Sequence, residues 1–149
     1  MAKTTGQPRK LKFNGHWLHV RRCDPATYFG FTYCITNRIT GKKYIGKKQY
    51  YSYSRGRRVK EMDWRNYAGS SKHLAADIEL YGKDNFEFLI LKEWKTRGWL
   101  AYAECNAQHK ADVLTAQLPS GDRAYYNAQI LATKHVPNPK FHPEECAKQ

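Results

Sequence analysis

The strongest constraint on the fold is a pair of aromatic and β-branched stretches separated by a short turn. Tyr28–Thr36 is rich in such residues, and Lys43–Gly46 has the same character beyond a turn at Asn37–Gly41. Two extended stretches around turn residues predict a β-hairpin. The turn type and the pairing register cannot be read from the sequence, so the face of the hairpin that each side chain takes stays open.

Three further segments follow the hairpin: a helix over Lys72–Tyr81, a strand over Asn85–Leu91 and a helix over Trp99–Leu114. Apolar residues recur on one face of each helix, and Ser70 or Ser71 can cap the first helix. The order strand, strand, helix, strand, helix predicts an α/β (α+β) fold. We expect a small mixed, mainly antiparallel three-stranded sheet flanked by helices.

The chain has 149 residues, the usual size of one domain, and its 41% hydrophobic and 14% aromatic residues suit a packed core. Composition divides it into a basic N-terminal arm over 1–24, a folded body over 25–132 and a proline-containing tail over 133–149. With no signal peptide and no long apolar run, we expect a cytoplasmic protein with no membrane partner.

Positive charge is concentrated in the first half of the chain. Residues 1–72 hold 17 Lys and Arg against 3 Asp and Glu, whereas residues 73–149 hold 9 against 10. A surface of this kind releases counterions when it binds a polyanion, which predicts a nucleic-acid partner. Charge that serves only solubility is the alternative, although solubility does not require such one-sidedness.

Four cysteines are present, and in a cytoplasmic protein we expect them to be reduced and mostly buried. A zinc site is an alternative, because histidines and cysteines stand near both ends of the chain. Its ligands would come from His16, His19, Cys23, His142 and Cys146.

Two tyrosines on the predicted hairpin carry the most specific signal. The segment Phe31–Gly46 holds Tyr33 near its start and the tripeptide Tyr44-Ile45-Gly46 at its end. It resembles the GIY-YIG nuclease family, in which two short motifs stand about ten residues apart. The second motif is complete, whereas the first keeps only its tyrosine, with Phe31-Thr32 where Gly-Ile is usual.

Further matches to the same family appear in the expected order along the chain. They are Tyr67–Ser71 before a helix, Tyr81–Phe86 before a strand, Glu104 on the next helix and Tyr125–Asn127. The resemblance covers roughly Tyr28 to Ile130, and it is greatest to phage-encoded, homing-type members.

The resemblance implies hydrolysis of DNA phosphodiester bonds with one divalent cation, Mg²⁺ or Mn²⁺. In that family Tyr33 is the favoured general base, Tyr44 positions water or phosphate, and Glu104 binds the metal. A phenol has an ordinary pKa near 10, so Tyr33 needs nearby cations such as Lys47 to lower its pKa. Glu104 borders the apolar stripe of its helix, where a carboxylate paired with a hard cation is chemically reasonable.

The resemblance also implies an arginine soon after the second motif, where a guanidinium can bind the phosphate in two places. Arg57 or Arg58 is our choice. Gly46 and Asn127 have supporting roles, and Asn127 is expected to fix the edge of the site through hydrogen bonds. A larger basic and hydroxyl-bearing set is expected to bind DNA: Lys47, Lys48, Arg55, Arg65, Ser70, Ser71 and Lys72.

The sequence therefore predicts a metal-dependent DNA endonuclease of a phage or mobile element, acting on double-stranded DNA in the host cytoplasm. A catalytically inactive DNA-binding protein that retains the fold is one alternative, motivated by the incomplete first motif. A basic RNA-binding protein is another, favoured by charge and aromatic residues alone. Monomer and homodimer are both compatible with the sequence.

Overall fold

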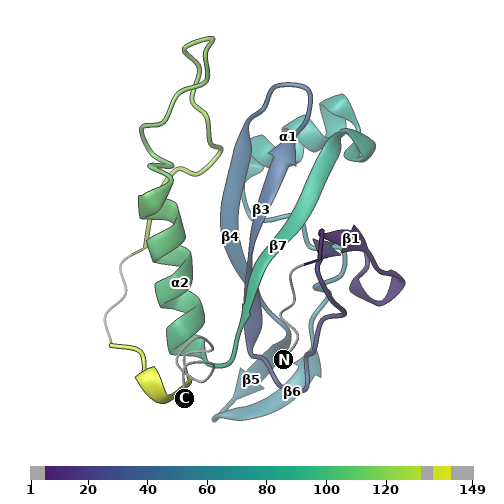
Figure 1. The fold of residues 1–149 in the computed structure, drawn as a ribbon, viewed down its shortest axis with the longest axis vertical. Helices are drawn as coiled ribbons and strands as arrows, with labels where there is room; N and C mark the ends of the chain where they lie inside the picture. The colour runs from purple at the N-terminus through teal and green to yellow at the C-terminus, as the bar shows by residue number, and fades with distance from the viewer. Residues whose placement is uncertain (1–5, 132–135, 142–149) are drawn as a thin grey trace.

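A computed structural model describes residues 6–131 and 136–141 (Figure 1). Its centre is a five-stranded sheet in the order β1-β2-β7-β3-β4, beside a separate two-stranded ribbon of β5 and β6. The strands are β1 (Arg9–Lys10), β2 (Leu18–His19), β3 (Gly30–Asn37), β4 (Lys43–Gln49), β5 (Tyr51–Ser54), β6 (Arg57–Glu61) and β7 (Phe86–Trp94). The helices are α1 (Lys72–Tyr81) and α2 (Arg97–Lys110), with short 3₁₀ turns η1 (Lys12–Asn14), η2 (Lys83–Asn85) and η3 (Pro139–Phe141).

The predicted hairpin is confirmed as β3 and β4, and its register settles the question that the sequence left open. Tyr33 stands opposite Gly46, and Tyr44 stands opposite Ile35. Directly paired residues share a face of the sheet and alternate residues return to it, so Tyr33 and Tyr44 lie on the same face. β7 pairs antiparallel with the other side of β3, which leaves β4 as the outer strand.

The sheet has five strands, so the expectation of three was wrong. β1 and β2 come from the N-terminal segment, and β2 pairs parallel with β7 at Leu18 and Leu89. Trp17 is fully buried and packs on Phe31, with ring centroids 5.1 Å apart. Strands of two residues are too short to show a hydrophobic period. The basic composition of this segment also gave no sign that Trp17 anchors it in the core.

The core is dominated by aromatic side chains on the Tyr33 face of the sheet. Its largest fully buried members are Trp17, Trp64, Tyr33, Tyr50 and Phe31. The indole Nε1 of Trp17 donates to the carbonyl of Trp64 at 2.7 Å, so even the polar atom of this ring has a partner. This hydrogen bond ties the N-terminal segment to the loop that precedes α1.

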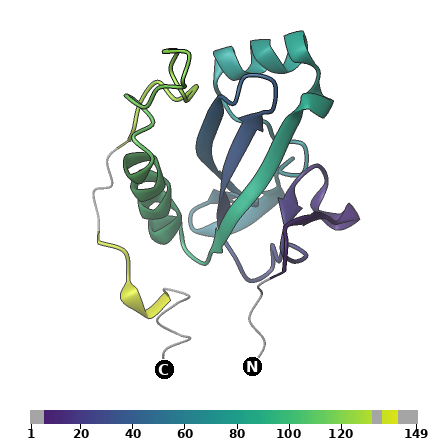
Figure 2. The same cartoon turned by 45° about the horizontal axis from the view of Figure 1, so that its top comes forward.

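Helix α1 begins and ends where the sequence indicates. The Ser71 hydroxyl accepts from the Leu74 amide at 3.2 Å, and Gly82 at φ 90° ends the helix. Helix α2 begins two residues before the expected start because Thr96 caps it. In Figures 1 and 2, α2 lies along the β4 side of the sheet, whereas α1 lies at the end opposite the β5–β6 ribbon.

The β5–β6 ribbon is an element that the sequence did not predict. It is antiparallel and turns at Arg55 and Gly56, whose φ values are 53° and 79°. Two successive residues with positive φ are typical of the tight turns that match strand twist in hairpins. The ribbon is inserted directly after β4, so it occupies the stretch that separates the second motif from α1.

Two other expectations concern cysteines and membranes. Cys23, Cys34 and Cys105 are free thiols, whereas His142 and Cys146 lie outside the described residues. Within residues 6–131 and 136–141, no group of three or more His, Cys, Asp and Glu side chains is placed to hold a metal. No helix in this part of the chain is long and apolar enough to cross a membrane.

Candidate active site

A pocket of about 460 Å³ lies at the outer edge of β4, between that strand, α2 and the beginning of α1. Side chains from five separate parts of the chain meet there. They include Tyr33, Tyr44, Lys47, Tyr67, Ser70, Ser71, Lys72, His73, Glu104, Gln108, Tyr126 and Asn127. The two hairpin tyrosines and the glutamate of the second helix therefore share one cavity.

The Tyr33 hydroxyl lies directly over Gly46, the last residue of the second motif. A Cβ atom built at Gly46 would come within 2.5 Å of the Tyr33 hydroxyl oxygen and 3.1 Å of a Tyr44 ring carbon. The backbone of Gly46 does not have positive φ, so it is the missing side chain that matters here. Gly46 supplies the space that the first-motif tyrosine needs.

Burial raises the pKa of Tyr33 well above its ordinary value of 10, and nearby Tyr67, Tyr44 and Glu104 raise this pKa further. Only 1% of the residue is exposed, and its ring lies edge-on to that of Tyr67, with ring centroids 6.1 Å apart. The sequence-based expectation that neighbouring lysines lower this pKa is therefore wrong for the protein alone. Tyr33 carries its proton at neutral pH unless positive charge is added beside it.

Tyr44 lies closer to solvent than Tyr33 and is held by the segment before α1. Its ring centroid is 6.2 Å from that of Tyr33, and its hydroxyl lies 3.3 Å from the Ser70 Oγ. Ser71 instead caps α1. The two adjacent serines therefore have different roles. Ser70 lies beside Tyr44, whereas Ser71 caps the helix whose first turn borders the cavity.

Glu104 is paired with Lys47 across the pocket, with Nζ and Oε1 3.1 Å apart. The Glu104 side chain is 16% exposed, which confirms its expected place at the border of the core. Its carboxylate lines a pocket of about 460 Å³, and one carboxylate with waters and a phosphate oxygen is a set of ligands with which proteins bind Mg²⁺. The residues present therefore fit one divalent cation. The ammonium of Lys47 would compete with that cation for the Glu104 carboxylate.

Asn127 holds the backbone of β4 at its outer edge. The Ile45 amide donates to the Asn127 Oδ1 at 3.1 Å, and the Asn127 Nδ2 donates to the Ile45 carbonyl at 2.8 Å. The Gln108 Nε2 donates to the same carbonyl at 2.9 Å. These bonds fix the strand between Tyr44 and Gly46, as expected of Asn127, and Gln108 joins it as a residue that the sequence did not point to.

Comparisons of the sequence with known proteins found two matches. Residues 9–130 match the family model described as "Putative endonuclease segE, GIY-YIG domain". The chain belongs to the GIY-YIG family. The curated protein "Putative endonuclease segE" of Enterobacteria phage T4 is 34% identical over 99 residues, which are 66% of this chain and 40% of the phage protein. The chain thus matches less than half the length of that relative, and no solved structure matches it.

The GIY-YIG membership confirms the resemblance drawn from the motifs, and the α/β fold agrees with it. The incomplete first motif has a clear structural basis in this chain. Phe31 is fully buried in the aromatic core, and Thr32 is 3% exposed on the other face of β3. The two residues that depart from the GIY-YIG pattern therefore change the core and leave the lining of the pocket unaltered.

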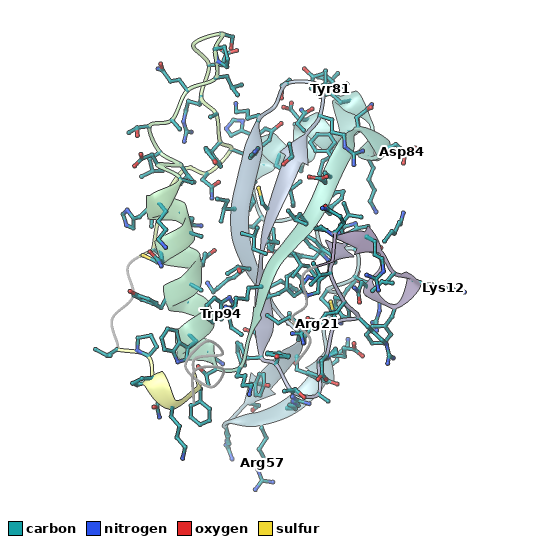
Figure 3. All side chains as sticks on the ribbon, viewed as in Figure 1. Lys12, Arg21, Arg57, Tyr81, Asp84 and Trp94 are labelled. Atoms are coloured by element: carbon teal, nitrogen blue, oxygen red, sulfur yellow. The ribbon has the colours of Figure 1, made fainter. Side chains whose placement is uncertain are left out.

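The two arginines chosen from the sequence do not reach the pocket of this GIY-YIG protein. Arg58 donates to the carbonyls of Pro25 and Ala26 at 3.0 and 3.1 Å and stacks on Tyr51. Arg57 extends from the far end of the ribbon (Figure 3). A phosphate clamp at either position finds no support here, because the inserted ribbon carries this basic stretch away from the site. The basic residues among those that line the pocket are Lys47, Lys72 and His73.

The remaining basic candidates are spread over the surface. The Lys48 ammonium lies 4.2 Å from the centre of the Tyr67 ring. Arg65 donates to the Phe13 carbonyl at 2.7 Å and pairs with Glu61 at 3.2 Å, so it stabilises the N-terminal segment. Arg55 lies at the exposed turn of the ribbon. Of the lysines and arginines expected to bind DNA, Lys47 and Lys72 line the pocket.

Sequence reasoning gave no role to Tyr67 or His73. Tyr67 lines the pocket with its ring edge-on to that of Tyr33, and its pKa is raised by burial and by Tyr44. It stands in a stretch that already matched the family, so the motif contained the signal. His73 follows Lys72 in the first turn of α1, and only its place beside the helix cap could have suggested it.

Proposed function

We propose that this protein is an endonuclease that cleaves DNA phosphodiester bonds and depends on a divalent cation, Mg²⁺ or Mn²⁺. The observation that carries the proposal is the convergence of Tyr33, Tyr44 and Glu104, from β3, β4 and α2, on one pocket. A candidate base, a positioning hydroxyl and a metal-binding carboxylate around one cavity are the groups that phosphodiester hydrolysis needs.

The phosphate of the DNA is held at the beginning of α1. The exposed amides of a helix N-terminus and its dipole favour anions, and Lys72 adds a full positive charge at the same place. The Ser70 hydroxyl, 3.3 Å from that of Tyr44, can bind a phosphate oxygen or the attacking water. These groups take the place of the expected arginine clamp, because the ribbon holds its arginines away from the pocket.

Glu104 would hold the cation, whose positive charge would stabilise the phosphate and the leaving 3′-oxygen. Lys47, 3.1 Å from the carboxylate, would compete with the cation for the same oxygen atoms and could otherwise neutralise a phosphate oxygen. The ion pair holds the Glu104 carboxylate in a defined orientation within the pocket.

As a phenolate, Tyr33 would accept the proton of the attacking water. Because burial raises its pKa, the phenol would first have to release its own proton to solvent, which positive charge in the pocket would favour. The edge-on ring of Tyr67 holds Tyr33 in place, and Tyr44 would position the water beside it. Without the added charge, the buried phenol is an inactive base.

A plasmid-nicking assay tests this function. Supercoiled plasmid and Mg²⁺ are incubated with the protein, with Glu104→Gln, and with Glu79→Gln, a matched control on the exposed side of α1. We expect Glu104→Gln to lower the nicking rate about 100-fold or more, with little change in DNA binding, because an amide is a poor ligand for Mg²⁺. Glu79→Gln should nick at the normal rate. Normal nicking by Glu104→Gln would refute the assignment.

We assign the protein to phage or mobile-element nucleases of the homing type, active on double-stranded DNA in the host cytoplasm. Support comes from the match to a phage T4 protein whose name contains "endonuclease". One pocket cuts one strand at a time, so cleavage of both strands requires a second copy or a second encounter. Sedimentation of the protein with and without duplex DNA separates a monomer from a homodimer.

A catalytically inactive DNA-binding protein is the second candidate, because the raised pKa of Tyr33 and the incomplete first motif both disfavour catalysis. The buried positions of Phe31 and Thr32 argue against it, since the lining is intact. The same nicking assay decides: a pure binding protein shifts the plasmid in a gel and leaves it supercoiled. Competition with duplex RNA tests the RNA-binding alternative.

A further inference from the structure

The β5–β6 ribbon presents a group of exposed cations that the proposed chemistry does not use. All five residues of β6 are exposed, and Arg55 and Gly56 form an exposed turn. Within the described part of the chain, the charged ends of Arg55, Arg57 and Lys60 make no ion pair or hydrogen bond. Residues 50–60 contain no Asp or Glu, so nothing on the ribbon before Glu61 offsets this charge.

The ribbon is nevertheless fixed to the body, unlike a loose basic loop. Tyr53 stacks on Phe29 with ring centroids 5.2 Å apart, and Arg58 is bound to two backbone carbonyls. At its base the buried Tyr50 donates to Glu93 at 2.6 Å, and the Met62 amide donates to the Tyr50 carbonyl at 2.8 Å. Its inner face is held in place, and its outer cations therefore keep a defined direction.

The position of the ribbon relates it to the pocket. β4 passes the pocket at Gly46 and continues into β5 almost without a break, so Arg55 is at most about 30 Å from Gly46 along an extended chain. Arg57 and Tyr81 lie at opposite ends of the molecule (Figure 3). One turn of duplex DNA is about 34 Å, so a duplex bound at the pocket reaches the ribbon within one turn.

We propose that the β5–β6 ribbon makes a second contact with duplex DNA. The ribbon enters the major groove within one helical turn of the phosphate that is bound in the pocket. The inference rests on the proposed function, because it takes DNA as the substrate. The major groove is about 12 Å wide and admits a two-stranded ribbon. Arg55, Arg57 and Lys60 contact the phosphates that border it and set the direction in which the duplex crosses the active site.

The test compares two triple variants that remove equal charge. The ribbon variant is Arg55→Gln, Arg57→Gln and Lys60→Gln. The control is Arg38→Gln, Lys83→Gln and Lys110→Gln, three exposed positions outside the ribbon, of which Arg38 already lies 4.0 Å from Glu87. Binding to a labelled duplex of about three helical turns is measured by fluorescence anisotropy in EDTA over a range of salt concentrations.

Each phosphate contact contributes about 0.9 to the slope of log Kd against log salt concentration, so three contacts contribute about 2.7. We expect the ribbon variant to lose that slope and to bind about 500-fold more weakly at 0.1 M salt, whereas the control keeps most of its affinity. Replacing Arg55 and Arg57 with lysine should preserve the slope, because charge is what contacts phosphate. Duplex RNA, whose major groove is too narrow for the ribbon, should bind the ribbon variant and the control alike.

Equal slopes for the ribbon and control variants would overturn the proposal, as would an equal loss for duplex RNA and duplex DNA. The substituted side chains are exposed, and their contacts are confined to long ones at the surface, such as the hydrogen bond of 3.3 Å from Arg38 to the Asp84 carbonyl, so the melting temperature of both variants should stay close to that of the wild type. Binding in EDTA does not depend on cleavage. If the wild type does not nick DNA but the ribbon variant loses the slope, the ribbon contact is supported and the proposed chemistry is refuted. If the wild type nicks DNA and the ribbon variant keeps the slope, the chemistry is supported and the ribbon contact is refuted.

Discussion

Replacing Gly46 with alanine should disrupt the pocket and the core together. The new Cβ would stand 2.5 Å from the Tyr33 hydroxyl oxygen, 2.7 Å from its Cζ and 3.1 Å from a Tyr44 ring carbon. Such distances force a shift of the ring, and Tyr33 is 1% exposed between Trp17, Tyr44 and Tyr67. A fully packed ring cannot move at low cost.

Overpacking by one methyl group in a rigid core costs about 1–3 kcal/mol, and we expect about 2 kcal/mol here. For a chain of this size the melting temperature should fall by about 4–8 °C, as measured by circular dichroism. Part of the cost is contact with the hydroxyl, so Gly46→Ala combined with Tyr33→Phe should be less destabilised than the sum of the single changes, by about 1 kcal/mol.

Gly98→Ala is the matched control. Gly98 lies in the first turn of α2, and a Cβ there would meet nothing nearer than the Pro137 Cα at 4.0 Å. Because alanine favours helix over glycine, this variant should be as stable as the wild type or slightly more stable. If Gly46→Ala and Gly98→Ala unfold at the same temperature, the close packing of Tyr33 on Gly46 is not what the motif glycine provides.

Two predictions concern buried ionisable groups. Burial lowers the pKa of His16 from 6.5 to about 4, so its contribution to stability is present above pH 6.5 and is lost as the pH falls toward 4. Between pH 6.5 and pH 4, the free energy of unfolding in urea should fall by about 2 kcal/mol less for His16→Phe than for the wild type. Equal falls in the two proteins would contradict this. Glu93 accepts hydrogen bonds from Arg21, the Asp24 amide and Tyr50 at 2.8, 2.9 and 2.6 Å. Glu93→Gln should therefore cost about 3 kcal/mol in urea unfolding, and an unchanged midpoint would show that these bonds add little.

Sequence reasoning located the elements that have a readable period or cap. Helix α1 is confirmed to the residue, because Ser71 and Gly82 mark its ends. Tyr33, Tyr44 and Glu104 were paired through the family pattern, and the structure places all three at one pocket. Periodicity alone would have left the faces of the tyrosines open, since register depends on the turn.

The missed features share one cause, which is that they depend on long-range packing. β1 and β2 are two residues each, and Trp17 gives them a place in the sheet only after the core exists. Arg57 and Arg58 stand at a suitable sequence distance from the second motif, but the turn at Arg55 directs them away from the pocket. Distance along a chain does not give direction in space.

The hydrogen bonds between Asn127 and β4 determine when the pocket is completed during synthesis of the chain. The outer strand of a sheet exposes amides and carbonyls that invite pairing with another chain. Here the Asn127 and Gln108 amides bind Ile45, while the Lys43 amide and carbonyl pair with Ala124 and Tyr126. During translation Gln108 emerges 63 residues after Ile45, and Asn127 emerges 82 residues after it. A chain that stops before Asn127 therefore has its two tyrosines but an unfinished pocket, so the proposed nuclease activity would arise only after residue 127 has been made.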